Sequence, residues 1–201
     1  MQKLKQYKTA RRLGARIFSK TQNPKFTLTK KHVVRKHPSP ITEYGLQLLE
    51  KQKMRFTYNL KERQFATYVK KAILKKGVSS AEHLYKNLES RLDNVVFRLG
   101  LAKTRPLARQ MVSHGHITVN GRRVNIPSSM VKEGDHVGIR PGSREKKMFA
   151  GIAESLKIHQ SPPWLVLDAE KREGSVVGVP KAEGHSGDVF NVGAVIGFYS
   201  R

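Results

Sequence analysis

The sequence feature that most restricts the fold is a pair of amphipathic helices followed at once by a hairpin. Apolar residues recur at helical spacing from Ser80 to Leu99, where Gly100 is placed to end the helix. Thr104 is a suitable N-cap for a second helix, which Gly115 ends. The Asn120-Gly121 dipeptide then lies between alternating apolar residues, and both positions of a two-residue hairpin turn need positive φ. This segment predicts two helices packed on a small antiparallel sheet.

The chain before this segment is predicted to be helical, and the chain after it is less regular. Helical spacing extends from Thr42 toward Tyr58 and again from Leu60 to Lys75. We expect a short helix and then short strands in the last third, in the ranges 152–158, 164–167, 176–179 and 195–199. The predicted fold class is α+β. Its parts are an extended basic arm (1–40), a mostly helical domain (41–90) completed by the tail (159–201), and the module of two helices on a sheet (91–158).

The charge of the chain predicts a polyanionic partner. Lys and Arg number 39 against 15 Asp and Glu, which gives a formal net charge of +24. A polyanion neutralises such an excess and releases its own counterions on binding. Nucleic acid is the natural candidate, and an anionic membrane surface is the weaker one. Residues 1–40 hold no acid at all and are expected to order only against this partner.

The arginines of the two central helices form stripes that flank the apolar faces. At about 100° per residue, Arg91 and Arg98 fall within a narrow arc together with Asn94. Arg105 and Arg109 form a second stripe with Ser113. Arginine binds phosphate through two parallel hydrogen bonds, and the free N–H groups at the start of the second helix add a further phosphate site. Single charges of this kind are usually ordinary solvated groups, but two flanking stripes on consecutive helices favour phosphate binding.

Several sequence motifs in and around these helices resemble a known family. SRLDNVVFRLG at 90–100 and SHGHITVNG at 113–121 resemble the RNA-binding module of the small-subunit ribosomal protein S-four family. That module also occurs in other RNA-binding proteins. YGLQL at 44–48 and ERQF at 62–65, however, resemble a helical domain found only in the ribosomal family, and WL at 164–165 with FYS at 198–200 resembles its tail.

The resemblance implies a primary ribosomal-RNA-binding protein of the small subunit. Such a protein binds early at a multi-helix junction in the 5′ domain, nucleates assembly of the body of the subunit and contributes to translational accuracy. Its implied partners are small-subunit ribosomal RNA, the neighbouring ribosomal protein numbered five at the accuracy-related boundary, and messenger RNA at its entry path.

The candidate RNA-contact residues follow from motif position in the module and from exposed basic positions elsewhere. Motif position assigns Arg91, Arg98, Thr104, Arg105, Arg109, Gln110, Ser113, His114, His116 and Asn120, followed by the hairpin residues Gly121 and Arg122. The arm and the helical domain add Arg11, Arg12, Arg16, Lys51, Lys53, Arg55 and Arg63.

The sequence departs from the family pattern at its start. Many family members carry zinc-ligating cysteines there, whereas this chain has no cysteine, so its arm must order on RNA without metal. The Gly-Gln-His-Gly run usual before the helical domain is replaced by His37-Pro38-Ser39-Pro40, which leaves contacts of that segment in doubt. We expect no metal site and no cofactor.

Catalysis is not predicted. Arg91-Leu92-Asp93 resembles the triplet of pseudouridine synthases, but it lies inside the first helix of the module with no catalytic domain to hold it, so Asp93 is interpreted as a helix-surface carboxylate. The alternative to a ribosomal protein is a free-standing RNA-binding factor of the stress or ribosome-rescue type. Such a factor would use the same module without needing the helical domain or the tail.

The chain carries no pattern typical of a membrane protein. No apolar stretch approaches the roughly 20 residues needed to cross a bilayer. Lys and Arg interrupt the early apolar clusters, unlike a secretory signal, although a basic, acid-free start keeps a mitochondrial transit peptide as a minor alternative. We therefore expect a cytoplasmic protein that resides in the ribosome, with an organellar ribosome as the lesser possibility.

Overall fold

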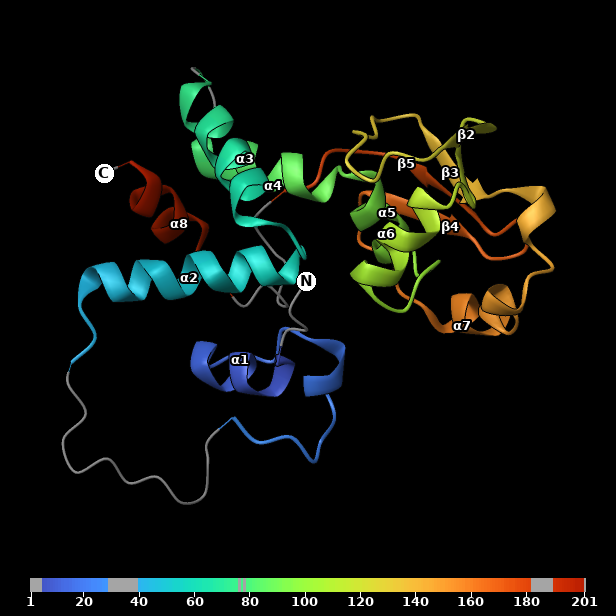
Figure 1. Cartoon of the computed structure of the whole chain (residues 1–201). Coiled ribbons are helices and arrows are strands. Elements are labelled where there is room, and N and C mark those ends of the chain that lie inside the picture. Colours follow the sequence, from blue (N-terminus) through green and yellow to red (C-terminus); the bar gives the residue numbers. More distant parts are fainter. Residues whose placement is uncertain (1–4, 29–39, 76, 78, 182–189, 201) are drawn as a thin grey trace. The chain divides into compact units, whose positions relative to one another are not determined.

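A computed structural model describes residues 5–28, 40–75, 77, 79–181 and 190–200 of the 201-residue chain. The chain forms two compact units (Figure 1). The helical unit comprises Met1–Ala81 together with Gly184–Arg201, and the sheet unit comprises Glu82–Glu183. The described residues include helices and one antiparallel sheet, so the predicted α+β class is confirmed.

The helical unit brings the end of the chain back to its first helices. Its elements are α1 (Gln6–Leu13), the 3₁₀ turn η1 (Ser19–Thr21), α2 (Glu43–Thr57), α3 (Glu62–Leu74) and α8 (Val192–Tyr199). Thr42 caps α2 as predicted, because its Oγ1 accepts a hydrogen bond from the Gly45 N–H at 3.2 Å. The red α8 lies beside the cyan α2 in Figure 1, and α8 also contacts α3.

A buried lysine holds α8 against the rest of this unit. Lys51 is 6% exposed, and its ammonium group lies 2.7 Å from Glu62 Oε1 and 4.5 Å from the centre of the Phe198 ring. The Tyr199 hydroxyl donates to the same Glu62 oxygen at 2.8 Å. The Asn191 N–H donates to Glu50 Oε2 at 2.7 Å. The prediction of a strand at residues 195–199 was therefore wrong. These residues belong to helix α8, whose last turn places Phe198 and Tyr199 against this cluster.

The described part of the basic arm is not extended throughout. Residues 6–13 form α1, whose Ala10 and Leu13 are buried, and α1 contacts α2. Phe26 is 5% exposed and its ring lies 5.5 Å from that of Tyr7. Apolar residues spaced along this acid-free stretch thus pack α1 within the helical unit. The His37-Pro38-Ser39 positions lie outside the described residues.

The sheet unit packs short helices on a five-stranded sheet. After α4 (Ser80–Glu89), which enters the unit at Glu82, its elements are α5 (Leu92–Arg98), α6 (Arg105–Ser113), β1 (Ile117–Val119), β2 (Arg122–Val124), β3 (His136–Ile139), η2 (Pro141–Ser143), η3 (Lys147–Phe149), α7 (Ile152–Ile158), β4 (Leu165–Asp168) and β5 (Glu173–Val176). The strand order is β2-β1-β3-β5-β4, and every neighbouring pair is antiparallel.

The two strands of the tail belong to this sheet. Strand β5 pairs with β3 through Val137 and Gly174, and β4 pairs with β5. The prediction that residues 159–201 complete the helical domain was therefore wrong for 165–176. Apolar side chains of these strands, such as Leu165 and Val176, are buried in the same core as α5 and α6. Only the last part of the tail joins the helical unit.

The hairpin turn forms where the sequence predicts it. Val119 pairs with Arg122, which leaves Asn120 and Gly121 as the two turn residues. Their φ values are 50° and 76°. Ile117 of β1 is fully buried among apolar side chains of α5 and α6, so the hairpin fixes the face on which both helices pack.

The predicted single helix from Ser80 to Leu99 is broken in the structure. Helix α4 ends at Glu89, and Arg91 has an extended backbone (φ −67°, ψ 137°) before α5 begins. The N–H of Leu92 donates to the Ser129 carbonyl at 2.8 Å, and the Val131 N–H donates to the Ser90 carbonyl at 2.9 Å. These bonds to a loop far along the chain replace the helical bonds lost at the break. None of the helices in the described part of the chain is long and apolar enough to span a membrane.

We predict that Gly174→Ala destabilises the sheet unit. A Cβ at this position would collide with Cδ2 of Leu99, whose side chain is fully buried in the core. We expect a loss of ~1–3 kcal/mol in the free energy of unfolding. Urea unfolding followed through the fluorescence of Trp164, the one tryptophan of the chain, measures it. Gly178→Ala is the control, since its Cβ would meet Trp164 at an ordinary 3.9 Å. Equal stability of the two variants would contradict this packing.

We also predict that acid loosens α8. Burial raises the pKa of Glu62, but hydrogen bonds from Lys51 and Tyr199, and the charges of Lys51 and Arg55, outweigh it, so the pKa lies below its ordinary value. Its contribution is therefore present above the unfolded pKa of about 4.3 and is lost as pH falls through the lower folded value.

Hydrogen exchange of the α8 amides, corrected for intrinsic rates, measures this effect between pH 5 and pH 3. In the wild type, protection of the α8 amides should decrease as the pH is lowered from 5 to 3. In Glu62→Gln it should already be weak at pH 5 and change less, because that variant lacks the titrating group. A wild-type α8 whose protection does not change with pH would count against the role of this carboxylate.

Candidate nucleic-acid interface

A fully buried glutamate organises the arginine of α5. Glu89, at the end of α4, is 0% exposed. Both its oxygens accept hydrogen bonds from Arg98, Oε2 from Nε at 2.9 Å and Oε1 from Nη2 at 2.8 Å. The Arg98 side chain is 20% exposed, so part of this guanidinium group reaches solvent. Such a two-point contact fixes both the position and the plane of the guanidinium group.

Asn94 connects this pair to α6. Its amide Nδ2 donates to Glu89 Oε2 at 2.9 Å, and its Oδ1 accepts from Arg105 Nε at 2.7 Å. Arg105 also lies over the ring of Phe97, with its guanidinium carbon 4.4 Å from the ring centre. Asn94 itself is only 2% exposed. The arginines at the end of α5 and the start of α6 are therefore joined through buried groups.

Asp93 is not the helix-surface carboxylate that the sequence suggested. It is 4% exposed and binds two arginines. Arg91 donates to both its oxygens at 3.0 and 2.8 Å, while Arg109 of α6 donates to Oδ2 through Nε and Nη2 at 2.9 and 2.8 Å. A buried carboxylate needs such partners because it has lost its water.

The two arginines on Asp93 differ in exposure. Arg91 is 2% exposed, so it is a structural group of the interior and is removed from the candidate contact set. The side chain of Arg109 is 28% exposed and stays in the set. Helical spacing alone had placed Arg91 on the same footing as Arg98, because the spacing does not show the break before α5.

Helix α6 presents several more of the candidate residues to solvent. Thr104 caps the helix, with its Oγ1 accepting from the Leu107 N–H at 3.3 Å, as predicted. Gln110, Ser113 and His114 are exposed along the helix and at its end. They supply amide, hydroxyl and imidazole groups next to the arginines.

His116 lies inside the sheet unit. It is 8% exposed, its Nδ1 lies 3.0 Å from Ser143 Oγ, and its ring meets the edge of Phe149. Burial, together with the charges of Lys146 and Arg140, lowers the pKa of His116 below its ordinary value. The histidine is therefore mostly buried in the sheet unit, which counts against its assignment as an RNA contact.

The hairpin turn is exposed and its asparagine is also a structural anchor. Asn120, Gly121 and Arg122 all reach solvent. The Asn120 side chain donates to Asp135 Oδ1 at 2.7 Å and accepts from the His136 N–H at 2.8 Å, so it ties the turn to β3. Arg122 is the cation of this turn that the sequence assigned.

Sequence reasoning missed a second group of cations near the turn after α6. Arg123 is exposed and lies directly against the backbone of Gly115. Arg140 and Lys146 are close enough to His116 to lower its pKa. The basic run RPGSREKK at 140–147 was the signal available for two of these residues.

The basic candidates of the helical unit differ widely in their surroundings. Lys51 is buried on Glu62, so it is a structural cation. Lys53 pairs with Glu50 at 2.6 Å, and Arg55 donates to Gln52 and lies 4.1 Å over the Phe56 ring. The remaining four, Arg11, Arg12, Arg16 and Arg63, are exposed.

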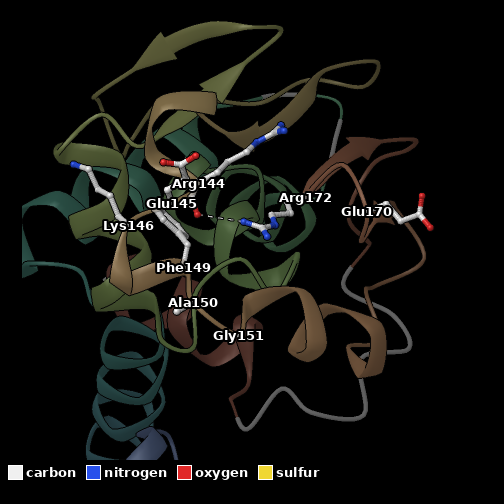
Figure 2. A pocket seen from close by; sticks show the side chains of 8 residues that line it. All are labelled: Arg144, Glu145, Lys146, Phe149, Ala150, Gly151, Glu170 and Arg172. Atoms are coloured by element: carbon white, nitrogen blue, oxygen red, sulfur yellow. Dashed lines mark hydrogen bonds between the residues drawn. The ribbon is translucent and has the colours of Figure 1, made fainter.

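A polar hollow of about 470 Å³ lies between the segment 144–151 and the turn before β5. Figure 2 shows Arg172 reaching across it to the carbonyl oxygen of Arg144, at 3.3 Å, while Glu170 points away. Three cations and two glutamates line the hollow. Because both signs of charge are present, the hollow shows no preference for an anion, and the α5–α6 arginines remain the stronger candidate.

We name these arginines, Arg98, Arg105 and Arg109, the arginine surface. Each is partly exposed, and each is held on one side by a buried polar group. Guanidinium groups fixed in this way suit phosphate groups of a nucleic-acid backbone. No group of three His, Asp or Glu that could hold a metal ion occurs among the residues the structure describes.

Comparison with known proteins covers most of the chain. Residues 2–89 match the family model of the ribosomal protein S4/S9 N-terminal domain, and residues 90–137 match that of the S4 domain. The small ribosomal subunit protein uS4 of Roseiflexus sp. (strain RS-1) is 42% identical over 208 residues, which span 96% of each chain. The protein of the same name from Chloroflexus aurantiacus (strain ATCC 29366 / DSM 635 / J-10-fl) is 42% identical over 94% of this chain and 89% of its own. That from Desulfitobacterium hafniense (strain Y51) is 49% identical over 142 residues.

We predict that Arg91→Ala strongly destabilises the sheet unit. It removes one of the two partners of buried Asp93, and breaking a buried pair costs about 3–5 kcal/mol. Urea unfolding measured through Trp164 tests this. Arg122→Ala is the control, because Arg122 is exposed and its loss should change stability little. A stable Arg91→Ala protein would return Arg91 to the set of candidate contacts.

Proposed function

Since the chain belongs to the ribosomal protein S4 family, it is a structural, non-enzymatic protein of the small ribosomal subunit that binds ribosomal RNA, and we propose that it binds this RNA through the arginine surface of α5 and α6. The observation that carries the proposal is the anchoring of each arginine on a buried polar group: Arg98 on Glu89, Arg109 on Asp93 and Arg105 on Asn94. Double-stranded RNA hides its major groove, so recognition through phosphates and shape suits such a surface.

The proposed contact set is the sequence-derived one without its buried members. In the sheet unit it comprises Arg98, Thr104, Arg105, Arg109, Gln110, Ser113, His114, Asn120, Gly121 and Arg122. In the helical unit it comprises Arg11, Arg12, Arg16, Lys53, Arg55 and Arg63, without the buried Lys51. Each of these groups is at least partly exposed, and this exposure supports the set together with the high positive charge of the chain.

We also propose a more specific role for the chain within the small subunit. We place the RNA site at a multi-helix junction of the 5′ domain, where early binding nucleates assembly of the body of the subunit. The helical unit, closed by α8, is proposed to face the neighbouring ribosomal protein numbered five and to affect translational accuracy. The basic surface of the chain is proposed to help line the entry path of messenger RNA. The match of residues 2–89 to a ribosomal family model favours this role over a free-standing RNA-binding factor.

We predict that the double change Arg105→Ala and Arg109→Ala weakens binding to the 5′ domain of small-subunit ribosomal RNA. Two phosphate contacts fewer should also reduce the slope of log affinity against log salt by about 1 to 2. Binding across a salt series measures both quantities. The control is Lys157→Ala on α7, which removes an exposed cation outside the contact set. An unchanged slope in the double variant, with its fold intact, would remove these arginines from the interface.

The same titration tests the ribosomal site itself when transfer RNA and duplex DNA are used as competitors. Binding to the 5′ domain should survive salt concentrations that release both competitors, because shape-specific contacts add to the charge contacts. Equal affinities for the three nucleic acids, falling together with salt, would show a general polyanion binder and would refute the proposed site.

A further inference from the structure

Three polar residues behind the arginine surface are too buried to touch RNA. Glu89 is 0% exposed, Asn94 2% and Asp93 4%. Each is nevertheless hydrogen-bonded to an arginine of that surface. Burying charged and amide groups is costly even when they are paired, and apolar residues of similar volume are often equally stable or more stable. The presence of these groups therefore calls for a reason other than stability.

We propose that Glu89, Asn94 and Asp93 are positioning residues, which hold the arginines of α5 and α6 in the arrangement that binds RNA phosphate. The inference rests on the proposed function of the arginine surface. An arginine that is already fixed loses less side-chain entropy when it binds, so anchoring raises affinity without adding a contact to the RNA.

Asn94 is the key member because it links the two helices. Its Nδ2 is held by a carboxylate oxygen of Glu89, so its Oδ1 must face Arg105 Nε. The opposite orientation would place the amide oxygen against the carboxylate and two donors against each other, which is unfavourable. The amide therefore has a single orientation. Glu89 in this way controls Arg98 directly and Arg105 through Asn94.

Asp93 plays the matching part for Arg109. The fully interior Arg91 fixes the carboxylate from one side, with contacts to both oxygens. Arg109 then binds Oδ2 through Nε and Nη2. Because Asp93 and Asn94 are consecutive residues of α5, one turn of this helix sets both arginines of α6.

The test is a double-mutant cycle of Asn94→Ala and Arg105→Ala, measured as affinity of the full chain for the 5′ domain of small-subunit ribosomal RNA. Asn94→Ala should weaken binding about tenfold, as expected for a lost hydrogen bond to a charged group. It should also reduce the salt slope by about 1, although it removes no charge. The double variant should bind like Arg105→Ala alone, because Asn94 acts through Arg105.

The outcomes of the cycle separate the possible roles of Asn94. A merely structural asparagine would lower the stability measured through Trp164, leave the salt slope unchanged and add its loss to that of Arg105→Ala. That result would overturn the proposal, as would an Arg105→Ala protein that binds like the wild type. If the wild type itself does not prefer the 5′ domain over transfer RNA, the proposed function fails instead.

A second test uses a variant for which net charge and arginine positioning predict opposite changes in RNA affinity. Glu89→Gln makes the chain more positive by one charge, so charge alone predicts tighter RNA binding. Positioning predicts weaker binding, on the order of tenfold, because Arg98 loses a charged anchor. Glu154→Gln changes the charge equally at an exposed site on α7 and should not weaken binding. A folded Glu89→Gln protein that binds as tightly as Glu154→Gln would contradict the proposal. If Glu89→Gln does not fold, the cycle on Asn94 decides.

Discussion

The sheet unit depends on the burial of two carboxylates at the junction of α4 and α5. Glu89 and Asp93 are almost inaccessible to water, and a buried carboxylate is tolerated only when charged or polar donors surround it. This condition fixes where the donors lie: Arg91 in the interior, and Arg98 and Arg109 at the edge of the interior. The geometry of the binding surface is thus a consequence of how the core satisfies its own acids.

The parts of the fold that could be predicted are those decided by neighbouring residues. The Asn120-Gly121 turn and the Thr104 cap depend on the conformations of a few consecutive residues, and both form as expected. The break between α4 and α5 depends on bonds from Leu92 to the distant Ser129. Helix α8 likewise depends on side chains of α2 and α3. No short window of sequence contains these partners, and apolar spacing continues through the break.

The same limit applies to the site. Spacing at helical intervals finds the arginines, but it does not separate a guanidinium that faces the interior from one that faces solvent. Arg91 and His116 belong to the recognised motif and are both buried, whereas Arg123 lies outside the motif residues and is exposed. Lysine is usually a surface residue, but Lys51 is buried under the rings of Phe198 and Tyr199. Burial is a property of the assembled core, so only the structure sorts these residues.

The closure of the helical unit by α8 has a consequence for the order of folding during synthesis. Contacts from Asn191 and Tyr199 reach back to Glu50 and Glu62, across the whole of the sheet unit in the sequence. A domain usually folds once its residues have left the translating ribosome. Here the sheet unit is fully synthesised before α8 emerges, so the unit that begins first is completed last. Helices α2 and α3 therefore lack their contacts with α8 until the sheet unit has been synthesised.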